Sequence, residues 1–112
     1  MSSDFNVIWQ HHILPLKDQS VSTATGKTNL ITRVTNEFLE RKSSNGRLSK
    51  ISKVYFEKCY CVLLREGILT RTQINATYGK RCSSIVVVVL GTFVPGIKLN
   101  KTPTISLELI NN

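Results

Sequence analysis

The first sixteen residues carry apolar side chains at helical spacing. Their i, i+3, i+4, i+7, i+8 pattern places five residues on one face: Phe5, Ile8, Trp9, His12 and Ile13. Asp4 can cap such a helix, and Pro15 ends it. The pattern predicts an N-terminal helix within residues 1–16 and a Ser/Thr-rich loop over residues 17–28.

The middle of the chain predicts two longer helices. The first runs from about Leu30 to Lys42 and buries an apolar face before the turn-forming segment 43–46: Leu30, Ile31, Val34 and Phe38. The second runs from about Leu48 to Glu66, and Gly67 closes it. Its apolar stripe is wide: Leu48, Ile51, Val54, Tyr55, Cys59, Val62 and Leu63.

A fourth, shorter helix is predicted after Thr70. Thr70-Arg71-Thr72-Gln73 matches a capping box, in which the Thr hydroxyl and the Gln side chain accept from each other's backbone N–H groups. Gly79 can end this helix.

The pattern then changes to one typical of strands. Ser84–Leu90 is a β-branched run, and Thr104–Leu109 alternates apolar and polar residues. Gly91, Pro95 and Gly96 mark a loop between them. About four helices followed by a C-terminal β-hairpin indicate a single α+β domain over residues 1–112, with residues 29–112 forming the helical core and the hairpin.

Charge points to polyanionic partners. The 112 residues contain 15 Lys and Arg against 7 Asp and Glu, a net charge of +8. Such an excess favours nucleic acid first, acidic protein surfaces second and anionic membranes third, although it can also serve only solubility. Three cysteines without a framework spacing, and the lack of a leader pattern, favour an intracellular, reducing compartment.

Gly26-Lys27-Thr28 reproduces the end of a phosphate-binding loop. The full pattern needs a further Gly five residues before Gly26, where Val21 stands, and a buried strand in front of the loop. Neither is present in the sequence, so the triplet is interpreted as a chance match.

The sequence shows no convincing pattern of metal ligands or catalytic residues. On a helix, Cys59 and Cys61 diverge by about 200°, so they cannot chelate one ion together. His11 and His12 diverge by about 100°, and Cys82 is distant in sequence. The acidic residues are scattered. We therefore expect no metal, no cofactor and no enzymatic activity.

Basic residues gather around the predicted turn at 43–47 and the helix that follows it. Six lie within 18 residues: Arg41, Lys42, Arg47, Lys50, Lys53 and Lys58. They can follow a phosphate backbone, or they can form an ordinary solvated helix face. Arg71, Gln73, Lys80 and Arg81 extend the candidate nucleic-acid-binding set begun by Lys50 and Lys53.

Three segments have a more particular likeness. Residues 51–59 (ISKVYFEKC), 69–74 (LTRTQI) and 83–89 (SSIVVVV) resemble the C-terminal winged-helix domain of AAA+ replication initiators. That family includes the largest subunit of the origin recognition complex and its fungal silent information regulator relative. The resemblance covers roughly residues 48–110. It implies a winged-helix-like, nuclear chromatin module in which the helix matching Thr70–Tyr78 lies in the major groove of duplex DNA.

The predicted hairpin loop departs from the DNA-binding members of this family. Initiator wings resemble Gly/Arg-rich loops, whereas residues 91–98 (GTFVPGIK) are largely apolar. The resemblance then favours the silencing-type relative, whose winged helix is a self-association element in heterochromatin.

Phe93, Val94 and Ile97 are hard to bury in so small a domain. They support the same interpretation, since exposed apolar patches mark protein contacts. The alternative is that the N-terminal helix, with Phe5, Ile8 and Trp9, covers them. We therefore predict a homodimer that also contacts chromatin proteins, with direct duplex DNA binding as the second hypothesis. The predicted dimer interface comprises Ile85, Val87, Val89, Phe93, Val94, Ile97 and Trp9.

Overall fold

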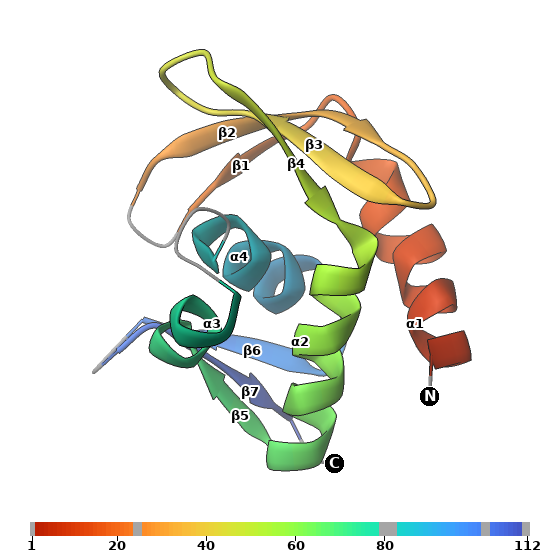
Figure 1. Cartoon of the computed structure of the whole chain (residues 1–112), viewed down its shortest axis with the longest axis vertical. Coiled ribbons are helices and arrows are strands. Elements are labelled where there is room, and N and C mark those ends of the chain that lie inside the picture. Colours follow the sequence, from red (N-terminus) through yellow and green to blue (C-terminus); the bar gives the residue numbers. More distant parts are fainter. Residues whose placement is uncertain (1, 24–25, 79–82, 102–103, 111–112) are drawn as a thin grey trace.

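The computed structural model describes residues 2–23, 26–78, 83–101 and 104–110. Within these residues the chain is an α+β domain with four α-helices and two antiparallel sheets. Its central element is helix α4 (Ser83–Phe93), which lies between a four-stranded and a three-stranded sheet in Figure 1. Helices α2 (Lys53–Glu66) and α3 (Arg71–Tyr78) flank α4.

A helix is present at the N-terminus, but it begins at Ser2, so Asp4 lies within it and does not cap it. It comprises α1 (Ser2–Ile8), a π-helical turn η1 (Trp9–Ile13) and a 3-10 turn η2 (Leu14–Leu16). Trp9 is fully buried, donates its indole N–H to the Thr35 carbonyl at 2.8 Å, and meets Phe56 of α2 edge-on. These contacts fasten the N-terminal helix to the core.

The four-stranded sheet, sheet A, occupies sequence for which a loop and a helix are predicted. It consists of β1 (Ser20–Ser22), β2 (Thr28–Val34), β3 (Phe38–Lys42) and β4 (Leu48–Ser52) in sequence order. The predicted helix over residues 30–42 is therefore wrong, and so is the helical start at Leu48. The predicted turn does occur, between β3 and β4, where Ser43 N–H donates to the Arg47 carbonyl at 2.9 Å.

Helix α2 confirms the predicted long helix from Lys53 onward, 14 of its 19 residues. The Ser52 hydroxyl caps its start by accepting from Val54 N–H at 3.2 Å. Gly67 ends it with a φ of 83°, a left-handed conformation that glycine adopts without strain, and donates to the Leu63 carbonyl at 2.8 Å.

The three-stranded sheet, sheet B, has the order β5-β7-β6. Its strands are β5 (Ile68–Thr70), β6 (Ile97–Asn100) and β7 (Ser106–Leu109). The predicted strand at 104–109 is present as β7, but its neighbours are β5 and β6. Ser84–Leu90 is not its partner, because that run lies in α4.

Helix α4 corrects the prediction of a strand at residues 84–90. Ile85 to Leu90 are all buried, with at most 4% of any side chain exposed. A segment that is apolar on every side can form a helix where the surrounding elements bury every side, and the helix then satisfies its own backbone groups. The end predicted for α3 at Gly79 lies outside the described residues.

Candidate functional site

The outward side of sheet A is an open, basic surface. Alternate residues of a strand point to opposite faces, and the inward residues Ile31, Leu39 and Ile51 are at most 3% exposed. The opposite side is what we call the outer sheet face, defined by Leu30, Arg33, Phe38, Glu40, Lys42, Leu48 and Lys50.

Strand pairing places the residues of the outer sheet face opposite one another on neighbouring strands. Lys42 on β3 lies opposite Leu30 on one side and Leu48 on the other. Both leucines are exposed, 39% and 57% respectively. Lys42 therefore projects between two apolar side chains that can pack against its aliphatic stem while its ammonium stays in water.

Phe38 organises a second part of the outer sheet face. The Arg33 guanidinium carbon lies 5.0 Å from its ring centroid, and the Lys50 ammonium lies 4.8 Å from it. Both distances are within cation–π range. Two cations from β2 and β4 are thus held over one ring on β3, which fixes their positions without neutralising their charge.

One acidic residue, Glu40, lies among the cations of this surface, opposite Arg33 on β2 and Lys50 on β4. Its carboxylate accepts a hydrogen bond from the Thr32 hydroxyl at 2.9 Å and forms no ion pair with either cation. An ion pair is formed elsewhere, between Arg65 and Glu66 of α2 at 2.9 Å. The cations of the outer sheet face therefore remain available to an external anion.

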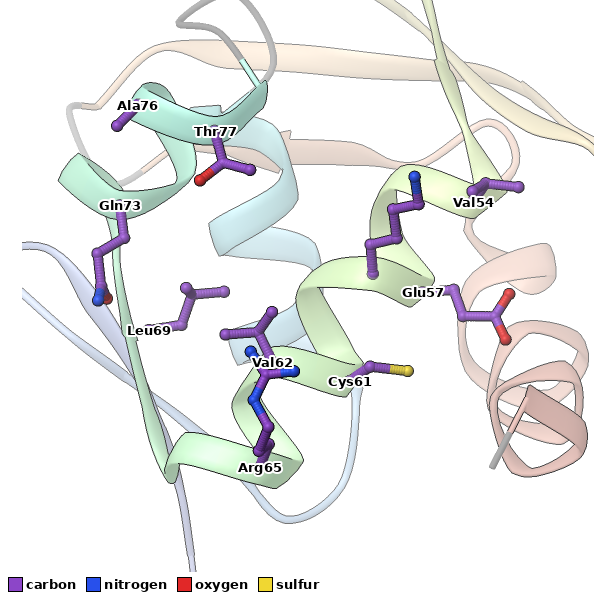
Figure 2. A pocket seen from close by; sticks show the side chains of 10 residues that line it. Val54, Glu57, Cys61, Val62, Arg65, Leu69, Gln73, Ala76 and Thr77 are labelled. Carbon is purple, nitrogen blue, oxygen red and sulfur yellow. The ribbon is translucent and has the colours of Figure 1, made fainter.

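A separate groove lies between α2 and α3. Its volume is about 820 Å³. Figure 2 shows Val62 of α2 and Leu69 of β5 pointing into the space between the two helices, with Gln73 of α3 and Arg65 of α2 beside it. Val54 and Ala76 add to its apolar lining, and Lys58 is a further cation along it.

The predicted nucleic-acid-binding residues do not form one surface. Lys50 lies on the outer sheet face, whereas Lys53 begins α2 and donates to the Asn6 side chain. Arg71 and Gln73 lie on α3, and only Gln73 lines the groove. Lys80 and Arg81 lie outside the described residues.

The residues of the predicted dimer interface belong to the core of the single chain. Six are buried, with at most 5% of the side chain exposed: Trp9, Ile85, Val87, Val89, Val94 and Ile97. Phe93 is half-buried and packs against the same core. The expectation that Phe93, Val94 and Ile97 are hard to bury is therefore wrong for Val94 and Ile97, which belong to the same buried core as residues of the N-terminal helix and sheet A. Self-association itself stays a prediction.

Two residues of the outer sheet face, Arg33 and Phe38, were missed by the sequence reasoning. The missed signal is the alternation through β2, in which buried Asn29 and Ile31 alternate with exposed Thr28 and Leu30. The helical spacing of Leu30, Ile31, Val34 and Phe38 concealed this alternation.

The described cysteine and acidic side chains do not form a cluster that could bind a metal ion. Cys59 is buried and Cys61 is exposed, so the two thiols lie on different sides of α2, as predicted from their spacing. Within the described part of the chain, no group of three or more His, Cys, Asp or Glu side chains is close enough to hold a metal ion. Cys82 lies outside that part.

Comparison with protein-family models, with curated proteins and with solved structures finds no match to this chain.

Proposed function

We propose that this chain is a non-enzymatic module that binds the phosphate backbone of nucleic acid across the outer sheet face. The observation that carries the proposal is the placement of Arg33, Lys42 and Lys50 on three adjacent strands, on the exposed side of sheet A. Phosphate neutralisation by Lys and Arg supplies most of the affinity in sequence-independent binding.

The dimensions of sheet A suit this ligand. Seven residues of β2 extend about 20 Å at ~3.3 Å per residue. One nucleic-acid strand presents a phosphate about every 3.4 Å of duplex axis, so the face can meet several phosphates at once. Phe38 already carries two cations, which leaves its ring poorly placed to stack on a base. Contacts to phosphates carry no sequence information directly, so binding should depend weakly on base sequence.

The arrangement of the C-terminal half supports a winged-helix relationship as part of the proposal. The elements follow the order α2, β5, α3, α4, β6 and β7, and the strand order β5-β7-β6 is compatible with a wing made of β6 and β7. In DNA-binding helix-turn-helix proteins the second helix of the motif enters the major groove. The resemblance implies this position for the helix at residues 70–78, which is α3, but with residues 83–93 helical the second helix of the motif is α4. Because Ile85 to Leu90 of α4 are buried, we assign nucleic-acid contact to sheet A instead.

The test compares two double variants that each remove two exposed lysines. Lys42→Ala with Lys50→Ala alters the outer sheet face, and Lys98→Ala with Lys101→Ala alters the region of sheet B. Binding to a short fluorescent duplex is measured by anisotropy over a series of salt concentrations. Each lost phosphate contact lowers the slope of log K against log salt by about one.

We expect the Lys42/Lys50 variant to lower the magnitude of that slope by about two, and the Lys98/Lys101 variant to leave it unchanged. Equal slopes for the wild type and the Lys42/Lys50 variant would overturn the proposal. A duplex of unrelated sequence should bind with similar affinity, and a strong preference between the two would refute the sequence-independent mode.

A further inference from the structure

A small polar pocket lies at one end of sheet A, on its inner side. The β1–β2 turn, the β3–β4 turn and the first turn of α4 surround it. Its volume is about 220 Å³. That is below the range of about 300–1,000 Å³ typical of pockets for drug-sized ligands, so the pocket suits a single small group. We call it the turn pocket, and its lining includes Thr23, Lys27, Asn29, Arg41, Ser44 and Ser84.

The chemistry of this lining favours an anion. Lys27 and Arg41 contribute two positive charges, and the other described residues around the pocket offer hydroxyl or amide groups. None of the described lining residues is acidic. Ser84 adds the first turn of an 11-residue helix, where partial positive charge develops.

Two of the side chains that hold Arg41 in place are neutral. Its Nη1 donates to the Asn29 side-chain oxygen at 2.8 Å, and its Nε donates to the Ser49 hydroxyl at 3.1 Å. Asn29 is itself only 2% exposed. The guanidinium is therefore fixed at the pocket without being neutralised by either of these two side chains.

Lys27 lies at the end of the β1–β2 turn, and two hydrogen bonds join it to Thr23. Thr23 N–H donates to the Lys27 carbonyl at 2.8 Å, and Lys27 N–H donates to the Thr23 hydroxyl at 3.1 Å. Gly26 has a φ of 91°, which glycine adopts readily. The turn thus holds the Lys27 backbone while its side chain remains exposed at the pocket.

We propose that the turn pocket binds a phosphate group, with Arg41 and Lys27 as the charged donors. Gly26-Lys27-Thr28 is not part of a nucleotide-hydrolase loop, because it joins two antiparallel strands and is followed by β2 rather than by a helix. The inference goes beyond the proposed function, since backbone binding on the outer sheet face requires no enclosed phosphate. The phosphate can be a free ion or the terminal phosphate of a nucleic-acid strand.

The experiment is an NMR titration with sodium phosphate at constant ionic strength, with sodium chloride as the reference salt. We expect saturable shifts of the Lys27, Arg41 and Ser84 amides with phosphate and not with chloride. Lys27→Ala should weaken phosphate binding about tenfold, the loss expected for one charge-assisted hydrogen bond. Lys27→Arg should retain most of the affinity.

Lys42→Ala separates this inference from the proposed function. Lys42 is not among the residues that line the turn pocket, so its loss should leave phosphate affinity unchanged while reducing the salt dependence of duplex binding. Wild-type phosphate affinity in Lys27→Ala, or shifts that do not saturate, would overturn the inference. A titration with 5′-phosphorylated and 5′-hydroxyl oligonucleotides of one sequence identifies the source of the phosphate. If the phosphate belongs to a strand end, the protein prefers the 5′-phosphorylated oligonucleotide and the preference depends on Lys27. Equal binding of the two oligonucleotides indicates free phosphate.

Discussion

At the start of α3, Thr70 and Gln73 each accept a hydrogen bond from the other's backbone amide. Gln73 N–H donates to the Thr70 hydroxyl at 3.1 Å, and Thr70 N–H donates to the Gln73 side-chain oxygen at 2.8 Å. This capping box is predicted from four consecutive residues and is present with both of its bonds. Local chemistry of this kind is readable from sequence because all of its participants are neighbours in the chain.

Removing the Thr70 hydroxyl should therefore destabilise the fold. We expect Thr70→Ala to lower the free energy of unfolding by about 1 kcal/mol, because one backbone donor at the start of α3 loses its partner. Urea unfolding followed by circular dichroism measures the change. Thr70→Ser keeps the hydroxyl and should lose much less, and Thr72→Ala tests the effect of an exposed Thr within α3. Equal losses for Thr70→Ala and Thr70→Ser would contradict this role.

At the scale of elements, the sequence of the β2–β3 hairpin predicts a helix instead of two strands. Leu30, Ile31, Val34 and Phe38 fit a helical face, but a bulge between Ile31 and Arg33 shifts the strand alternation. The turn that follows contains neither Gly nor Pro. It depends instead on the Thr35 hydroxyl, which accepts from Glu37 N–H at 3.1 Å and Phe38 N–H at 3.2 Å.

The sequence of helix α4 predicts a strand for a different reason. A short apolar run does not distinguish a buried strand from a buried helix by its periodicity, and its valines have a strand preference. Burial between the two sheets favours the helix, and sheet A lies in sequence that predicts a loop and a helix. The error at α4 thus follows from the error at residues 28–42.

Gly91 on α4 supplies a test of this packing. A Cβ atom at this position would lie 2.7 Å from Leu99 Cβ and 2.9 Å from Leu107 Cδ2, both in sheet B. Overpacking costs about 1–3 kcal/mol, whereas replacing a helical Gly by Ala returns only ~1 kcal/mol. We expect Gly91→Ala to lower the free energy of unfolding by about 1 kcal/mol.

Thr92→Ala is the matched control, since Thr92 is exposed on the same helix. It should leave the unfolding midpoint in urea nearly unchanged. A Gly91→Ala protein more stable than the wild type would contradict the close approach of α4 to sheet B.

At the scale of the whole molecule, the two sheets enclose α4 and leave their outer sides to the solvent. Residues 27–52 contain six Lys and Arg and two Glu, a net +4 of the chain's +8. Charge composition alone pointed to a polyanionic partner and located part of this basic segment. It did not reveal which residues share a face, because that depends on strands the apolar pattern concealed. The homodimer and the nuclear chromatin setting stay predictions, and any dimer surface must now be sought outside the core.

The most direct test of backbone binding by the outer sheet face is to map the contact on the wild-type protein. A duplex is titrated into ¹⁵N-labelled protein at low salt, and amide shift changes are followed by NMR. We expect the largest shift changes in β2, β3 and β4, around Arg33, Lys42 and Lys50, and no changes in sheet B. Changes concentrated in the groove between α2 and α3, or no changes at all, would contradict backbone binding by the outer sheet face.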